Sequence, residues 1–335
     1  MKNIAIILIL LFNSASVFSC TTFILKDSNQ LVFGRNLDWV SDNGIVVVNK
    51  RNMQKTSLVF PPERATSWIS RYGSITFNQF GKEFPFGGIN EKGLVVEIML
   101  VAGSYPKFDN RTAVNELQWI QYQLDNSSTI DEVINTDKFL RISKIDQNLH
   151  FLICDKDGNS AVIEFNKNGM IVYRGNDLPI PVLENDTYAK SLLKHKKKEE
   201  CRFSTASNMI EEYPTNKHSS IVDYSFDILD KVALDGSWSI VYDIKNMQIH
   251  FKTASNKKIR VINIDDFDFD CKTESLLYDL ESKDSKNINH LFIPYKPTLN
   301  KSKLDAAIKS NGIRLPKEVL DLFYNYNLRC KCLGN

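Results

Sequence analysis

A single cysteine, Cys20, stands where an apolar N-terminal segment gives way to a β-rich one. The segment begins with Lys2, is apolar from Ile4 to Phe12 and becomes small and polar before Ser19, which is the layout of a secretory signal peptide. We therefore expect residues 1–19 to be removed, so that Cys20 begins the mature chain. A cysteine in that position carries a thiol and a free α-amino group, which are a nucleophile and a base on one residue.

The strands that position Cys20 are predicted as a hairpin. Residues 20–25 and 31–36 are rich in apolar and β-branched types, and the polar residues 26–30 between them are typical of a turn. A symmetric turn pairs positions whose numbers sum to 56, so that Cys20 lies opposite Asn36.

This hairpin would bring Arg35 and Asp38 within one or two residues of the chain terminus. The charge of Arg35 would favour the thiolate of Cys20, and Asp38 would hold the amine in place. If the chain does not start at Cys20, an ordinary surface ion pair between Arg35 and Asp38 is the better interpretation.

Two carboxamides in polar turns are candidates for stabilising an oxyanion. They are Asn90, in the sequence GGINEKGL, and Asn185, in VLEND. Neutral donors that already point at a developing charge suit that task. The alternative for both is a turn or helix-cap residue.

The elements around these residues alternate between strands and helices. Strand-rich blocks at residues 20–60, 151–182 and 238–264 have short turns, which are typical of antiparallel sheets. Pairs of helices are predicted between them, near residues 114–135 and 187–213. This order predicts helical layers that cover stacked sheets. Two further short helices are predicted at residues 304–308 and 316–328.

Residues 56–86 are rich in aromatic side chains that are suited to lining an apolar pocket, although such a series is more often plain core. Two arginines in this stretch would meet an anionic group or simply lie at the surface. The aromatic residues are Phe60, Trp68, Tyr72, Phe77, Phe80 and Phe84, and the arginines are Arg64 and Arg71.

Composition narrows the classes of function. The formal net charge of +2 gives no argument for a nucleic-acid or membrane-surface role. Besides Cys20 the chain has five cysteines, an odd number, and Cys330 or Cys332 would be available to pair with Cys271 or another thiol. No histidine has a second histidine at ligand spacing, so we expect no metal.

Several motifs, in this order, resemble the choloylglycine hydrolase family of N-terminal-nucleophile hydrolases, which includes bile salt hydrolases and penicillin V acylases. They are Cys20-Thr21-Thr22, FGRNLDW at 33–39, FGKEFPFGGINEKGLVVE at 80–97, ELQWIQYQLDN at 116–126, HFLICDKDGNSAVIEF at 150–165, VLEN at 182–185 and WSIVYDIKN at 238–246.

The resemblance implies an α+β fold of four layers, αββα, with antiparallel sheets between helical layers. It also implies hydrolysis of a linear non-peptide amide through a thioester acyl-enzyme, with no cofactor and no metal. The catalytic residues that it implies are Cys20 as nucleophile, Arg35 and Asp38 as support, Asn90 and Asn185 as stabilisers of the tetrahedral intermediate, and Arg202 in EECRFSTAS as the final arginine.

We therefore expect a secreted or periplasmic cysteine amidase that removes an apolar acyl group from an amine. Conjugated bile acids, penicillin V and N-acyl homoserine lactones are the candidate substrates, and no nucleic-acid or membrane partner is expected after removal of the leader; a homo-oligomer is left open. The expected organisation is a signal peptide at 1–19, an amidase domain at 20–270 and a C-terminal extension at 271–335 that packs on the same domain. Two alternatives stay open: a lipoprotein anchored through Cys20, and a related dipeptidase.

Overall fold

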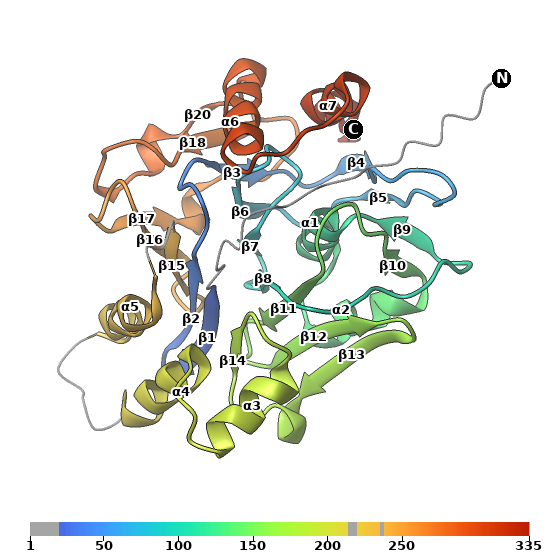
Figure 1. The fold of residues 1–335 in the computed structure, drawn as a ribbon. Coiled ribbons are helices and arrows are strands. Elements are labelled where there is room, and N and C mark those ends of the chain that lie inside the picture. The colour runs from blue at the N-terminus through green and yellow to red at the C-terminus, as the bar shows by residue number, and fades with distance from the viewer. Residues whose placement is uncertain (1–19, 214–219, 235–237, 335) are drawn as a thin grey trace.

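The computed structural model describes residues 20–213, 220–234 and 238–334. Two large sheets face each other in the centre of the molecule, and helices cover their outer faces (Figure 1). This is the α+β architecture of stacked antiparallel sheets between helical layers that the order of elements predicts. The expected signal peptide at 1–19 lies outside the described residues.

The first sheet has seven strands and holds the N-terminal hairpin. Its neighbours pair antiparallel, apart from the parallel pair at the β19 edge. Its order is β14 (Val182–Glu184), β1 (Thr21–Lys26), β2 (Leu31–Leu37), β15 (Trp238–Asp243), β16 (Gln248–Thr253), β17 (Arg260–Asn263) and β19 (Lys286–Asn287).

The second sheet has nine strands, and all of its pairs are antiparallel. Its order is β13 (Gly169–Arg174), β12 (Ser160–Asn166), β11 (Leu149–Cys154), β8 (Val95–Leu100), β7 (Gly87–Asn90), β6 (Ser74–Asn78), β3 (Ile45–Asn49), β18 (Leu276–Asp279) and β20 (Ile293–Pro294). Strands from the stretch after residue 271 therefore belong to both large sheets, so neither sheet ends at the expected boundary.

Helices close the two outer faces. On the first sheet, α5 (Ile221–Val232) packs against β1, β2 and β15, while α3 (Tyr188–Lys196) and α4 (Arg202–Glu212) cover β14. On the second, α1 (Glu116–Asn126) packs against β7 and β8 and is followed by α2 (Ile130–Asn135). The Asn115 side chain caps α1 by accepting from the N–H groups of Leu117 and Gln118.

The rest of the chain adds smaller elements. The predicted C-terminal helices are present as α6 (Pro297–Ser310) and α7 (Lys317–Tyr324), at the top of Figure 1. A three-stranded sheet joins β21 (Lys331–Cys332) to β4 (Met53–Thr56) and β5 (Ser67–Ile69), and β9 (Thr112–Val114) pairs with β10 (Leu140–Ile142). Among the described helices, none is long and apolar enough to cross a membrane.

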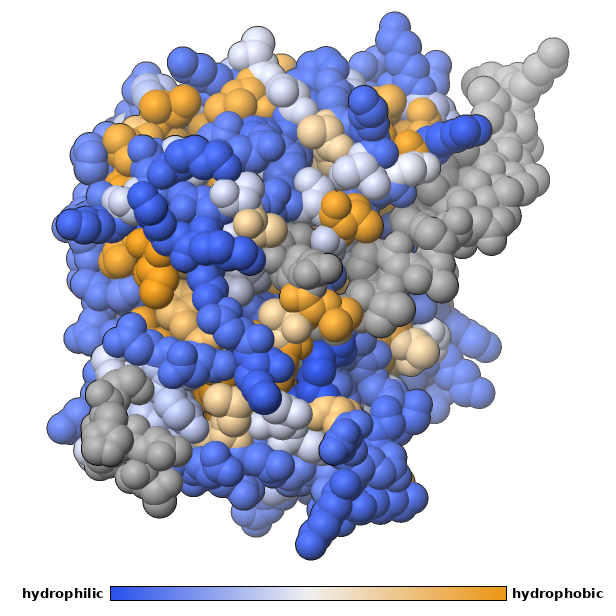
Figure 2. All heavy atoms as spheres, turned by 60° about the vertical axis from the view of Figure 1, so that its left-hand side comes forward, coloured by the Kyte–Doolittle hydropathy of each residue, from blue (hydrophilic) through white to orange (hydrophobic). Residues whose placement is uncertain are grey.

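The core between the sheets is aromatic. The ring of Phe77, on β6, lies 6.1 Å from that of Trp238 and 5.3 Å from that of Phe251, both on the first sheet. Outside this core, Figure 2 shows a face on which hydrophilic residues predominate and hydrophobic residues appear in separate groups. Trp68 and Phe77, two of the candidates for an aromatic pocket, are buried core residues instead.

The hairpin register differs by one residue from the expected one. Thr22 pairs with Arg35, so paired numbers sum to 57 and Cys20 does not face Asn36. The cause is the turn, where the Asp27 carboxylate accepts from the N–H groups of Asn29 and Gln30, so Lys26 can still pair with Leu31. Because a shift of one residue moves side chains to the other face, Arg35 lies on the Cys20 face of the sheet.

Candidate active site

Cys20 lies directly before β1 and is 3% exposed. Thr21 pairs with Glu184 of β14 on one side and with Asn36 of β2 on the other. Continuing both ladders by one residue places Cys20 between Asn185 and Leu37. Its thiol lines a cavity of about 710 Å³ that opens between the two sheets and the C-terminal helices. Cys20 is unbridged, as a nucleophile must be.

Arg35 is buried on the same face as Cys20. Its Nε is paired with Glu97 Oε2 at 2.5 Å, its Nη1 donates to Asn36 O at 2.6 Å, and the side chain of Cys20 is a further hydrogen-bond partner. Burial lowers the pKa of Arg35, but the charges of Glu97 and Cys20 outweigh it and hold this pKa above its ordinary value. The guanidinium is therefore a fixed positive charge beside the thiol.

Glu97 and Tyr242 complete the polar array beneath Cys20. Glu97 comes from β8 of the second sheet, so its pairing with Arg35 crosses the core between the sheets. Tyr242 donates a hydrogen bond to Glu97 Oε1 at 2.6 Å, and burial raises the pKa of this tyrosine well above its ordinary value. Burial raises the pKa of Glu97 to about 7, against the opposing effects of Arg35 and Tyr242.

Sequence reasoning missed both Glu97 and Tyr242. A carboxylate in the otherwise apolar run VVEIML was the available signal, because a buried charge is retained only with a partner. Tyr242 carries no comparable signal, since tyrosine is common in strands.

Asp38 directly follows β2 and is buried. The thiol of Cys20 lies 4.0 Å from the carbonyl oxygen of Asp38. The hairpin therefore brings the backbone of Asp38 next to Cys20, as the sequence predicts.

Asn185 and Arg202 meet on the β14 side of Cys20. Asn185 follows β14, its Nδ2 donates to Leu100 O at 3.1 Å, and its Oδ1 accepts from Arg202 Nη2 at 3.3 Å. Arg202 is the first residue of α4, and its Nε has no acceptor among the described residues. These two predicted residues are thus brought to the same end of the hairpin as Cys20.

The structure does not bring Asn90 to this site. Its Nδ2 donates to the carbonyls of Leu124 and Ser127 at the end of α1, and its Oδ1 accepts from Lys92 N and Leu94 N. Every hydrogen-bonding position of this amide is used on the helix-covered side of the second sheet. Asn90 is a turn residue that fastens β7 to α1, so the predicted role in stabilising an oxyanion does not fit its position.

The cavity beside Cys20 is lined mostly by apolar side chains. Phe60, Phe80 and Phe84 from the aromatic stretch are among them, whereas Arg64 and Arg71 are not. Arg71 is instead exposed and 3.8 Å from Glu132. Further lining residues that sequence reasoning did not single out are Trp39, Phe86, Ile98, Met99, Leu100 and Leu117.

A histidine base or a bound metal ion would be the alternative to a self-sufficient cysteine. Nδ1 of His150 is 3.1 Å from Glu164 Oε1 and Nε2 is 2.9 Å from Glu184 O, so both ring nitrogens are occupied away from the thiol. In the part of the chain that the structure describes, no three His, Cys, Asp or Glu side chains are grouped to hold a metal ion.

Comparison with known proteins shows which family the chain resembles. The model of the linear amide C-N hydrolases, choloylglycine hydrolase family, matches residues 20–197. A penicillin V acylase of Pectobacterium atrosepticum is 27% identical over 201 residues, which are 51% of this chain and 50% of that protein. The chain therefore matches about half the length of this relative.

Two solved structures share the fold. A penicillin V acylase from Agrobacterium tumefaciens has a TM-score of 0.71 at 22% identity, covering 83% of this chain and 98% of its own. A variant of conjugated bile acid hydrolase from Clostridium perfringens has a TM-score of 0.64 at 17% identity, covering 81% and 100%.

Stacked antiparallel sheets between helices, with a buried cysteine directly before the first strand, define the N-terminal-nucleophile class of hydrolase fold. Because the family match covers more than half of the sequence, the chain belongs to the choloylglycine hydrolase family of linear amide C-N hydrolases.

Proposed function

We propose that this protein is an exported cysteine amidase that hydrolyses a linear amide with an apolar acyl group. Removal of residues 1–19 frees the α-amino group of Cys20, and that amine takes the thiol proton. The observation that supports this most directly is the buried, unbridged Cys20 at an apolar cavity, with Arg35 beside it and Asn185 next along the ladder.

The first half of the reaction forms a thioester. The thiolate attacks the amide carbonyl carbon, and the carbonyl oxygen becomes an oxyanion that the carboxamide of Asn185 stabilises. The C–N bond then breaks, and the departing amine takes the proton held by the α-ammonium group. The acyl group remains on the sulfur of Cys20.

The second half regenerates the enzyme. The α-amino group takes a proton from water, and the hydroxide attacks the thioester carbon. The C–S bond breaks, the sulfur recovers a proton, and the carboxylic acid leaves. Arg35, fixed by Glu97, balances the negative charge of the thiolate in both halves.

Penicillin V, conjugated bile acids and N-acyl homoserine lactones are the candidate substrates within this class. Each carries an apolar acyl group on an amine, which suits a cavity lined by phenylalanine and aliphatic side chains.

The decisive experiment determines the start of the mature chain and its activity together. Intact mass and N-terminal sequencing of the exported protein should show a chain that begins at an unmodified Cys20. Turnover of the three substrates should then fall at least about 1,000-fold in Cys20→Ser, as for loss of a covalent nucleophile.

Cys154→Ala is the matched control, because Cys154 is also an unbridged, buried cysteine but lies in β11. It should keep most of the activity. A lipid on Cys20, or a start before it, would overturn the proposal in favour of a lipoprotein. Turnover of dipeptides in place of acyl amides would favour the dipeptidase.

A further inference from the structure

The far wall of the cavity comes from the C-terminal part of the chain. Residues of α6, of the connection 311–316 and of α7 line the same cavity as Cys20 and Arg35. None of this wall lies within the family match, which ends at residue 197. Its apolar lining residues are Leu304, Ile308, Ile313, Leu315, Val319 and Phe323.

Polar contacts anchor α6 to the body of the protein. Asn300 Oδ1 accepts from Lys82 N at 2.7 Å, and Asn43 Nδ2 donates to Lys303 O at 2.9 Å. Lys303 also forms an ion pair with Asp279 of β18 at 2.6 Å. The inner side of α6 therefore has a fixed position over the cavity.

Aromatic packing anchors α7. The ring of Phe84, which lines the cavity, lies 4.9 Å from Phe323 and 5.1 Å from Tyr326. The hydroxyl of Tyr326 donates to Thr56 O at 2.7 Å. Phe84 and Phe323 thus form a continuous surface between the family core and the C-terminal helix.

The loop that carries Phe84 is itself fixed by buried charges. Lys55 Nζ lies 2.6 Å from Glu83 and 2.9 Å from Asp125, and all three side chains are at least 97% buried. Burial lowers the pKa of Lys55, but the two carboxylates outweigh it and raise this pKa above its ordinary value. The ion pairs hold the loop against β4 and α1, so the wall packs on a rigid support.

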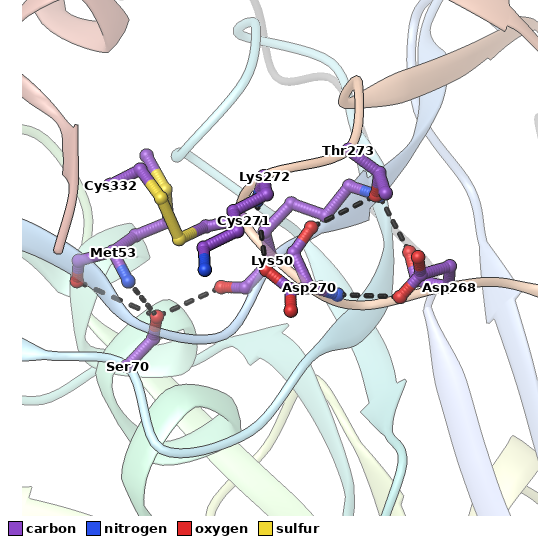
Figure 3. The surroundings of a disulfide bond; sticks show 9 residues. All are labelled: Lys50, Met53, Ser70, Asp268, Asp270, Cys271, Lys272, Thr273 and Cys332. Carbon is purple, nitrogen blue, oxygen red and sulfur yellow. Dashed lines mark hydrogen bonds between the residues drawn. A yellow bond between two sulfur atoms is a disulfide. The ribbon is translucent and has the colours of Figure 1, made fainter. Parts of the chain in front are cut away.

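A disulfide bond closes the C-terminal segment that contains α6 and α7. The disulfide between Cys271 and Cys332 joins the turn after β17 to β21, and β21 pairs with β4 (Figure 3). Close by, Lys50 Nζ donates to Asp268 O and Thr273 Oγ1, which fixes the Cys271 side of the bridge. Both wall helices therefore lie inside a loop whose two ends are held on the main body.

We propose that α6, residues 311–316 and α7, here called the C-terminal wall, determine which acyl groups the enzyme accepts. The carbonyl carbon of the substrate must reach Cys20, so an extended apolar acyl group lies along the cavity toward the wall. The substrate class is then an amide of a medium or long apolar acyl group, and the wall sets its greatest length. This inference rests on the proposed amidase function.

A series of acyl p-nitroanilides from butyryl to dodecanoyl tests it. Wild type should gain about fourfold in kcat/KM per methylene until the chain meets the wall, because each buried methylene contributes about that factor. Ile308→Trp and Leu315→Trp should lower kcat/KM at least tenfold for the longest groups and leave butyryl within twofold. Ile308→Ala should extend the accepted length.

Leu328→Trp is the matched control, because Leu328 is 67% exposed and does not line the cavity. Its profile should coincide with that of wild type. An active wild type whose length profile is unchanged in both tryptophan variants and in Ile308→Ala would overturn the role of the wall.

Binding of decanoate separates this inference from the proposed function. Calorimetry on Cys20→Ala, with and without Ile308→Trp, needs no turnover. At least tenfold weaker binding with Ile308→Trp supports the wall, even if no amide is hydrolysed and the proposed function fails. Equal binding in the two proteins counts against the wall.

Discussion

Two asparagines that look equivalent in the sequence do different work in the structure. Asn90 is the last residue of β7 and Asn185 directly follows β14, and a polar turn comes after each. The amide of Asn90 is saturated by four backbone groups, whereas Asn185 continues the ladder beside Cys20 and contacts Arg202. Turn composition alone does not distinguish them, because the difference is their place in the fold: Asn90 ends a strand of the second sheet, and Asn185 follows a strand of the first.

Alanine substitutions should separate the two roles. Asn185→Ala should lower kcat by about 100- to 1,000-fold, as for loss of an oxyanion donor. It should lower the free energy of unfolding less than Asn90→Ala does, because Asn185 is only half-buried and water can replace its bonds to Leu100 O and Arg202. Asn90→Ala should leave kcat within a few fold and lower the free energy of unfolding by about 1–3 kcal/mol, because it leaves the carbonyls of Leu124 and Ser127 unsatisfied. Steady-state kinetics and urea unfolding of both variants check this, and the reverse pattern would restore Asn90 to the catalytic set.

The buried acid beneath Cys20 predicts a dependence of stability on pH. Glu97 has a pKa of about 7 in the folded chain and an ordinary value of 4.5, so between these pH values the folded state holds a proton that the unfolded state has lost. Stability attributable to Glu97 is therefore lost as pH rises from about 4.5 to 7. Relative to Glu97→Gln, the free energy of unfolding of wild type should fall by about 3 kcal/mol across this window.

Urea unfolding of wild type and Glu97→Gln at several pH values between 4 and 8 measures that difference. The constant cost of leaving Arg35 without its ion pair offsets the two curves but does not change their relative slope. Parallel curves would show that Glu97 has the same pKa in the folded and unfolded chains.

Among the elements, the β1–β2 hairpin was predicted from the sequence in its strands but not in its register. Alternation and turn composition located both strands, and hence the approach of Arg35 and Asp38 to Cys20. The register required knowing that the Asp27 side chain closes the turn. That one-residue difference decides whether Arg35 faces the thiol or the helical layer.

Two further elements, α5 and β6, were not predicted from the sequence. Residues 221–232 form α5, whose N-cap Ser220 accepts from Asp223 N, and this cap was the available signal. Residues 74–78 form β6, in the middle of the second sheet, although the surrounding aromatic residues suggested a pocket-lining insert. Both faces of β6 are buried, so alternation between polar and apolar residues is weak there.

Close packing also explains why position 34 in the hairpin is a glycine. A Cβ atom added to Gly34 would lie 2.3 Å from Cζ of Phe23, on the face of β2 that α5 covers. Glycine in FGRNLDW therefore allows the Phe23 ring to lie across β2, which keeps the hairpin close to the helix that supports it.

At the scale of the whole molecule, one cavity joins the N-terminal hairpin to the C-terminal helices. Cys20 and the C-terminal wall are more than 270 positions apart in sequence yet line one space. The composition of residues 272–335 gave no functional signal, because its apolar residues take on meaning only once the helices pack over the cavity. The disulfide at the base of the wall is the element whose removal tests this arrangement.

Replacing both Cys271 and Cys332 with serine should destabilise the protein by about 4 kcal/mol, since the bridge spans 61 positions and restricts the unfolded chain accordingly. The loss should begin locally: hydrogen exchange should quicken in α6 and α7 well before β1 and β2, because the bridge anchors the end of that segment. Dithiothreitol should reproduce both effects in wild type and change nothing in the double variant. Equal exchange rates in α6 and α7 with and without the bridge would mean that the noncovalent contacts of Phe84, Tyr326 and Asn300 alone hold the wall in place.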